Sequence, residues 1–282
     1  MINNKTEVAL HETLHKHSTK KIKMEGYFKN PRLNIFPHVE KIIGKKISGS
    51  VLDVGAGNGY AGIWVAKNRD TRVTLLECTD EATQNVIPHC AKYFDVLDAC
   101  HIQKGSFYDL SDYEKKFDFV ICFGVLHHSN NLLNVMDNIM SVLKPGGVLI
   151  AQEPYTKNNI DNQVFNDIYN AEEIFAGKVI RHGDRDDHFY RKCEYLTAIH
   201  HSGLSIIKQQ DVSGLVNKKS LRGFISRFLL KAKRYFKNAE QHQDVPFPEM
   251  RSQKLKPKHL LLLCQKPLLR EIPPHRWCRG ET

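Results

Sequence analysis

The chain has 282 residues, of which 41% are hydrophobic, and this length suits one large α/β domain with additions better than two large domains. No apolar run approaches the roughly 20 residues of a membrane-spanning helix, and the polar first residues lack the apolar core of a signal peptide. The seven cysteines form no CxxC pair, which favours reduced thiols. We therefore expect a single main domain in a cytoplasmic protein.

The formal net charge of +10 predicts anionic partners. RNA, phospholipid headgroups and a phosphorylated small substrate all match this charge. The charge alone therefore leaves these classes of partner open.

Residues 1–48 are expected to form an amino-terminal arm and a leading helix. Residues 11–15 match the HExxH pattern, which places two histidines on one helical face as zinc ligands. Lysines flank this pattern and no third ligand is evident, so we expect no metal site. Tyr27 and Phe28 end the arm, and they either cover a ligand site or lie on the surface.

Residues 49–268 are expected to form the main domain, which begins with a strand, a glycine turn and a helix. The strand runs through Val51 to Val54, and the helix follows from Tyr60. Glycines let the backbone turn sharply and let a ligand approach closely. The turn that contains Gly55, Gly57 and Gly59 is therefore predicted to bind a ligand.

Two acidic residues accompany this turn. Asp53 lies at the carboxyl end of the first strand, which faces the crevice where open parallel sheets bind ligands. Glu77 ends the second strand, where nucleotide-binding folds place an acid on the ribose hydroxyls. The GxGxG spacing differs from the dinucleotide pattern GxGxxG, and Asp53 would repel a pyrophosphate. Both observations disfavour NAD.

Further strands and helices are expected to alternate along the chain. A helix capped by Asp80 is predicted to run to about Phe94, and a second helix from Asn130 is predicted to end at the turn 144–147. The remaining strands are expected at residues 99–103, 117–124, 148–151, 204–207 and 259–264.

The glycine turn with its acids, and the run from Phe117 to Pro154 with its KPGG turn, resemble class I S-adenosylmethionine-dependent methyltransferases, in particular small-molecule members of type 11/12. The resemblance covers about residues 50–155. It implies an α/β fold with a Rossmann-like, doubly wound, seven-stranded, mostly parallel sheet and helices on both faces. It also implies S-adenosylmethionine as the cofactor.

The resemblance implies cofactor contacts at Asp53, Gly55, Gly57, Gly59, Glu77, Cys78, Ser106, Phe107 and Phe123. Asp53 would lie near the cofactor's amino group, and Glu77 would accept hydrogen bonds from the ribose. Ser106 and Phe107 would bracket the adenine. Ser106 stands where many relatives have an acid that binds the adenine amino group.

Methyl transfer from a sulfonium requires alignment and, for some acceptors, removal of a proton. The loop after the fourth strand contains His127 and His128 in place of the (D/N)PP(Y/F) motif, which disfavours methylation of base amines. We expect these histidines and Glu153 to accept a proton or orient the acceptor. The alternatives are that one histidine packs under the cofactor and that Glu153 caps a turn.

Two insertions, about 156–188 and 212–258, are expected to cover the substrate, and residues 269–282 form an irregular tail. Residues 220–237 are predicted to form a basic amphipathic helix that either docks on the core or contacts a membrane peripherally.

The predicted function is methylation of a small metabolite, glycan or lipid-linked acceptor, including anionic ones. The alternatives are an RNA-directed methyltransferase and a non-catalytic binder of S-adenosylmethionine on the same fold. The insertion 156–188 favours an enclosed pocket over a nucleic-acid groove. The sequence leaves the methylated atom and the oligomeric state open.

Overall fold

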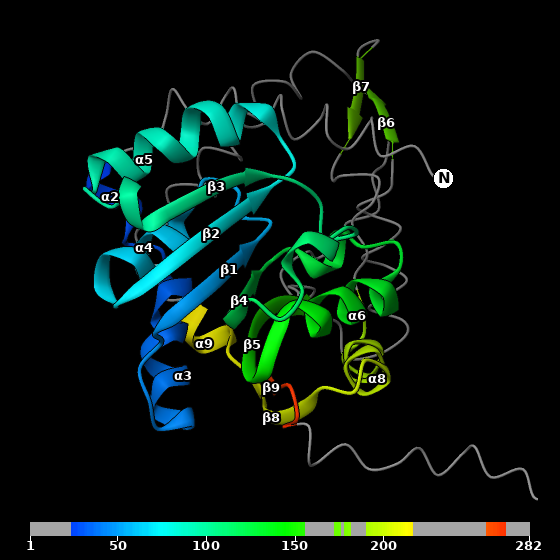
Figure 1. The fold of residues 1–282 in the computed structure, drawn as a ribbon. Coiled ribbons are helices and arrows are strands. Elements are labelled where there is room, and N and C mark those ends of the chain that lie inside the picture. The colour runs from blue at the N-terminus through cyan, green and yellow to red at the C-terminus, as the bar shows by residue number, and fades with distance from the viewer. Residues whose placement is uncertain (1–23, 156–171, 176–177, 182–189, 217–257, 269–282) are drawn as a thin grey trace, which may run out of the picture.

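A seven-stranded sheet forms the centre of the computed structural model, which describes residues 24–155, 172–175, 178–181, 190–216 and 258–268 (Figure 1). The strand order is β3-β2-β1-β4-β5-β9-β8. The strands are β1 (Gly49–Val54), β2 (Thr71–Glu77), β3 (Cys100–Lys104), β4 (Phe117–Phe123), β5 (Leu143–Tyr155), β8 (Ser205–Asp211) and β9 (Lys258–Gln265). Strands β1 to β5 are parallel, and β9 is antiparallel to β5 and β8. The predicted mostly parallel sheet of seven strands is therefore confirmed.

Helices pack on both faces of the sheet (Figure 1). One face packs against α2 (Met24–Tyr27), the 3₁₀ helix η1 (Pro31–Asn34), α3 (Ile35–Ile43), α4 (Tyr60–Asn68), the π-helical segment η2 (Ala82–Val86), α5 (Ile87–Tyr93) and α9 (Ser213–Val216). The other face packs against α6 (Leu132–Val142) and α8 (Lys192–His201). Short 3₁₀ turns occur at η3 (Leu97–Ala99), η4 (Ser111–Tyr113) and η5 (Leu126–His128).

Alternating side chains of the central strands explain these two apolar layers. In β1, Val51 packs in the layer that contains α3 and α4, whereas Leu52 and Val54 pack in the layer that contains α6 and α8. Successive strand residues point to opposite faces, so a strand that is covered on both sides is apolar throughout. This burial fixes the register and brings the carboxyl ends of β1, β2 and β4 to one edge.

Two predicted boundaries are wrong. Strand β5 begins at Leu143, so the residues 144–147 lie within the strand, where its pairing with β4 is irregular between Phe117 and Phe119. Asp80 is the first residue of its helix and not its cap, and its carboxylate pairs with Lys104 at 2.6 Å. An acid within the first turn still suits the positive end of the helix dipole.

The insertion 156–188 contains a hairpin that the sequence did not predict, in which β6 (Glu172–Phe175) pairs with β7 (Lys178–Arg181). The HExxH residues 11–15, the amphipathic segment 220–237 and the tail 269–282 lie outside the described residues. None of the helices in the described ranges has both the length and the apolar character that crossing a bilayer demands.

Candidate cofactor and acceptor site

The glycine loop lies at the carboxyl end of β1 with its glycines in left-handed backbone conformations. Gly57 has a φ of +59°, and a Cβ added there would meet no atom within 4 Å. By contrast, a Cβ on Gly55 would lie 2.3 Å from Val125 of the loop after β4. The loop therefore packs tightly against β4 on one side and leaves open space at Gly57 for a ligand.

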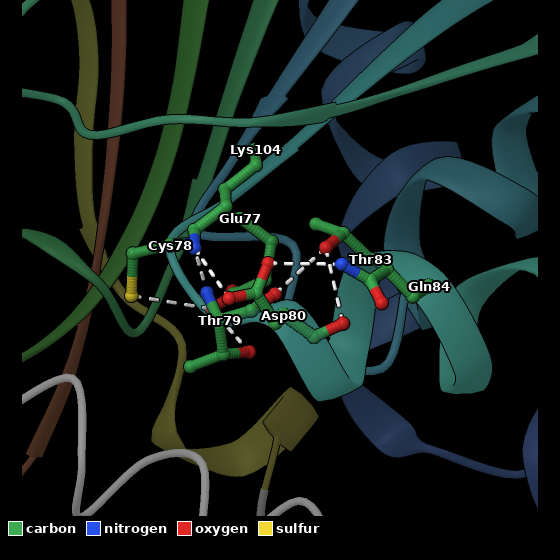
Figure 2. A network of polar contacts seen from close by, with 7 residues as sticks. All are labelled: Glu77, Cys78, Thr79, Asp80, Thr83, Gln84 and Lys104. Atoms are coloured by element: carbon green, nitrogen blue, oxygen red, sulfur yellow. Dashed lines mark hydrogen bonds and ion pairs between the residues drawn. The ribbon is translucent and has the colours of Figure 1, made fainter.

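Glu77 holds the glycine loop and the turn after β2 at the same time. Figure 2 shows its contacts with the turn. Its Oε2 accepts a hydrogen bond from the Gly57 N–H at 2.8 Å. Its Oε1 accepts from the backbone N–H groups of Cys78 at 2.9 Å and Thr79 at 3.2 Å. The side chain is 6% exposed. Oε1 also accepts from the Cys78 thiol at 3.3 Å and the Thr79 hydroxyl at 3.2 Å, whereas Oε2 accepts from Gly57 alone among the described residues. Oε2 therefore keeps a second acceptor position for a ribose hydroxyl beside the open face of Gly57.

Asp53 is buried beneath the glycine loop at 2% exposure. Its Oδ2 accepts a hydrogen bond from the Gly62 N–H in the first turn of α4 at 2.8 Å. Burial raises the pKa of Asp53 to about 7, with a further increase from the charge of Glu77, against the lowering effect of the Gly62 hydrogen bond. A positively charged group of a ligand near this carboxyl would favour its ionised form.

The loop 105–108 is anchored to α6. The Asn138 amide donates to the carbonyl groups of Phe107 at 3.0 Å and Tyr108 at 2.9 Å. The Ser106 hydroxyl accepts from the Tyr108 N–H at 3.2 Å, which closes a tight turn. Ser106 and Phe107 thus lie on a fixed loop at the end of β3, which neighbours β2 and Glu77 in the sheet. This placement is compatible with their predicted contacts to adenine.

Glu153 organises the loop after β4. Its side chain is 0% exposed, and Oε1 accepts from the N–H groups of Val125 at 2.9 Å and Leu126 at 3.0 Å. Its Oε2 lies 2.8 Å from Nδ1 of His127. The loop and His127 thus surround its carboxylate, which favours a role in positioning the loop over direct contact with the acceptor.

The two predicted histidines lie together at this edge. The ring centroids of His127 and His128 are 4.0 Å apart, and the N–H of half-buried His127 lies 3.4 Å from Oε2 of Glu153. The adjacent Ser129 carbonyl accepts a hydrogen bond from the Tyr190 hydroxyl, so the segment that leads into α8 is tied to the same loop. Sequence positions far apart therefore converge beside the ends of β4 and β5.

The methyltransferase domain family model matches residues 45–217, which is more than half of the chain and includes the glycine loop, Glu77 and Glu153. The chain belongs to the methyltransferase domain family. The resemblance that the sequence suggested is therefore confirmed, and S-adenosylmethionine is the cofactor of this family and of this chain.

Curated relatives include small-molecule methyltransferases. Sterol 24-C-methyltransferase ERG6A of Gibberella zeae is 29% identical over 171 residues, which are 61% of this chain and 43% of that protein. Glycine/sarcosine/dimethylglycine N-methyltransferase of Actinopolyspora halophila is 23% identical over 213 residues, which are 69% of this chain and 37% of that protein. The chain thus spans less than half the length of these relatives.

Solved structures share the fold. The [4+2]-cyclase SpnF has a TM-score of 0.59 and 18% identity, with 84% of this chain and 81% of that chain covered. Geranyl diphosphate C-methyltransferase from Streptomyces coelicolor, solved with S-adenosyl-L-homocysteine, has a TM-score of 0.53 and 11% identity, with 77% and 69% covered. At these identities the similarity concerns the fold, and fold alone does not assign the reaction.

The residues of this methyltransferase domain fit the cofactor. Gly57 offers an open backbone surface, Glu77 places an acceptor oxygen beside it, and Asp53 places a carboxyl below the loop, which is compatible with the predicted contacts to the ribose and the amino group. Cys78 lies next to Glu77, with its thiol 3.3 Å from Oε1. Phe123 is different, because its buried ring stacks on Phe36 at 5.2 Å within the core. Its side chain is therefore part of the core, so the predicted contact of Phe123 with the cofactor would have to come from its backbone.

Two residues at this edge, His259 and Arg32, escaped the sequence analysis, and the contact of a third, Tyr27, was not predicted by it. The Tyr27 hydroxyl donates to the Asn58 carbonyl in the glycine loop at 2.5 Å, so Tyr27 supports the loop. Nδ1 of His259 in β9 lies 2.9 Å from the buried Gln152 amide. Arg32 approaches Gly124 from η1. No spacing rule links these distant positions to the glycine turn.

One cleft lies away from this edge. It has a volume of about 900 Å³ and is lined by residues at the amino ends of β1, β2 and β3, among them Ser50, Arg72 and His101. Parallel sheets of this class bind ligands at the carboxyl ends, so we place the site at the glycine loop. Within the described ranges no cluster of histidine, cysteine and acidic side chains is arranged to hold a metal ion.

Proposed function

We propose that the protein is an S-adenosylmethionine-dependent methyltransferase that acts on a small-molecule acceptor, including lipid-linked molecules. The observation that carries this proposal is the contact of Glu77 with Gly57 beneath an open loop surface. This arrangement would place a hydrogen-bond acceptor for the ribose hydroxyls next to a backbone surface that the cofactor can approach closely. Both residues lie within the region 45–217 that the methyltransferase domain model matches.

Cofactor binding would use the edge formed by β1, β2 and β3. Glu77 would accept from the ribose hydroxyls, the loop with Ser106 and Phe107 would flank the adenine, and Gly57 would lie against the cofactor. When bound, S-adenosylmethionine supplies an electrophilic methyl group on a sulfonium. The protein's own contribution is alignment of the acceptor and exclusion of water.

Proton removal from the acceptor would fall to His127. The carboxylate of Glu153 accepts a hydrogen bond, so the Nδ1 atom that faces it at 2.8 Å carries the proton in neutral His127. The lone pair then lies on Nε2. A histidine with its tautomer and ring orientation fixed in this way is suited to act as a general base. His128 would contact or orient the acceptor from the same turn.

The small-molecule acceptor is supported by the names of the relatives, which include sterol and glycine methyltransferases. The sequence Gly124-Val125-Leu126-His127 after β4 also lacks the motif expected for base amines. The cyclase on the same fold shows why the reaction itself needs a direct test. The acceptor atom is left to experiment.

The test is transfer of a radiolabelled methyl group from S-adenosylmethionine to fractions of a cell extract. We expect label in a small-molecule or lipid fraction with wild-type protein and none with Gly57→Val. Gly44→Val is the matched control, because Gly44 also has a positive φ and open space but ends α3 at a distance from the loop. Label confined to RNA, or no label in any fraction, would contradict the proposal.

A further inference from the structure

Arg32 is held rigidly beside the cofactor edge by the short helix η1. The Asn30 side chain accepts from the Arg32 N–H at 3.0 Å and caps this turn. The next residue, Leu33, is buried in the core, and η1 packs against α9. The backbone of Arg32 is therefore fixed on both sides.

The guanidinium of Arg32 reaches the end of β4. Its Nη1 lies 2.9 Å from the position that a Cβ on Gly124 would occupy, so the guanidinium packs directly against the backbone of Gly124. The side chain also lies close to the Tyr60 hydroxyl at the start of α4 and close to His259. Arg32 thus stands between the helix that follows the glycine loop and the loop that follows β4.

Two polar groups at this place lack complementary partners. Among the described residues, no carboxylate lies within ion-pair distance of the Arg32 guanidinium. The Tyr60 hydroxyl next to it is buried and has no well-oriented hydrogen-bond partner in the same ranges. A half-buried cation beside an unsatisfied hydroxyl is costly unless a ligand completes both. A carboxylate satisfies a guanidinium and a hydroxyl donor together.

The sheet order indicates which part of the cofactor lies there. Glu77 ends β2, on one side of β1, and Gly124 follows β4, on the other side of β1. A cofactor with its ribose at Glu77 that crosses the glycine loop therefore presents its amino-acid end toward β4. The α-carboxylate is the anionic group of S-adenosylmethionine, and it would arrive beside Arg32.

We propose that Arg32, with the Tyr60 hydroxyl, binds the α-carboxylate of S-adenosylmethionine. The inference rests on the proposed function, and it gives the amino-terminal segment before the family-matched region a direct role in cofactor binding. An anionic group of the acceptor offers the same chemistry, and the experiment separates the two sources.

The experiment compares calorimetric binding of S-adenosylhomocysteine with that of its decarboxylated analogue, which keeps the amino group. Wild-type protein should bind S-adenosylhomocysteine roughly 10- to 100-fold more tightly, as expected for charge-assisted hydrogen bonds. Arg32→Met should remove this preference by weakening S-adenosylhomocysteine alone, and Arg32→Lys should keep part of it. Arg72→Met, at an exposed arginine of β2, is the matched control and should leave both affinities unchanged.

Each result discriminates. Equal binding of the two ligands by wild-type protein, or an unchanged preference in Arg32→Met, would overturn the inference. An anionic group of the methyl acceptor would then be the remaining ligand for the guanidinium. Equal weakening of both ligands would overturn it in favour of a structural role. Thermal unfolding reports whether Arg32→Met folds, and Arg32→Lys provides the comparison if it does not. Failure of wild-type protein to bind either ligand would instead contradict the proposed function.

Discussion

Substitution of Glu153 tests whether its carboxylate holds the loop after β4 in place. Its carboxylate accepts two buried backbone hydrogen bonds, from Val125 at 2.9 Å and Leu126 at 3.0 Å. Each buried N–H that loses its acceptor costs about 1–3 kcal/mol, so Glu153→Ala should lower the free energy of unfolding by about 2–6 kcal/mol. This is a large part of the 5–15 kcal/mol that is typical of a domain.

Glu153→Gln separates the effect of Glu153 on the loop from its effect on His127. The amide oxygen can still accept from Val125 and Leu126, so the loss of stability should be about 1–2 kcal/mol. The amide NH₂ would face His127 Nδ1, which must then accept, and the ring proton moves to Nε2. If His127 is the general base, turnover should fall at least about 100-fold with little change in cofactor affinity.

The assay is urea denaturation of wild-type protein and both variants, compared at equal m-values. Glu114→Ala serves as the control, because Glu114 is an exposed acid that pairs only with its neighbour Lys115 among the described residues, and its loss should leave stability unchanged. Equal stability of Glu153→Ala and wild-type protein would refute the positioning role. Glu153→Gln as unstable as Glu153→Ala would refute the explanation by backbone hydrogen bonds.

Three further predictions concern the rest of the site. Glu77→Ala should weaken S-adenosylhomocysteine by about 1–3 kcal/mol in calorimetry, and an unchanged affinity would exclude the ribose contact. The raised pKa of Asp53 means that the folded state keeps a proton that the unfolded state has lost, so the contribution of Asp53 to stability should decline from pH 4 to about 7 and then level off. The difference in the free energy of unfolding between wild-type protein and Asp53→Asn, measured by denaturation at each pH, should show this decline. His127→Ala should lower turnover much more than cofactor affinity once the acceptor is known, and full turnover would leave alignment alone as the mechanism.

The central part of the fold could be predicted because its signals are local. Seven partly apolar runs predicted the strands. Burial on both faces explains why the inner strands are nearly apolar throughout, whereas the edge strands β3 and β8 are more exposed and carry polar residues. The glycine turn and Glu77 could likewise be predicted, because the spacing between them is a recognisable sequence pattern. The start of β5 was missed because Gly146 and its neighbours indicate a turn, although pairing with β4 extends the strand through them.

The contacts between distant segments could not be predicted in the same way. Glu153 binds a loop 26 to 28 residues earlier, and a sequence pattern does not distinguish this role from contact with the acceptor. Arg32 precedes Gly124 by more than 90 residues, and only the packing of η1 against α9 brings it to the site. Tyr27 was noticed as an aromatic residue, but its hydrogen bond to Asn58 depends on tertiary structure.

Calorimetric titration of wild-type protein and Gly57→Val with S-adenosylhomocysteine and with NAD tests the central claim most directly. We predict one-site binding of S-adenosylhomocysteine by wild-type protein and by the Gly44→Val control, no binding by Gly57→Val, and no binding of NAD by any of them. Binding of NAD without S-adenosylhomocysteine, or equal binding of S-adenosylhomocysteine by a folded Gly57→Val, would contradict the placement of the cofactor on the glycine loop.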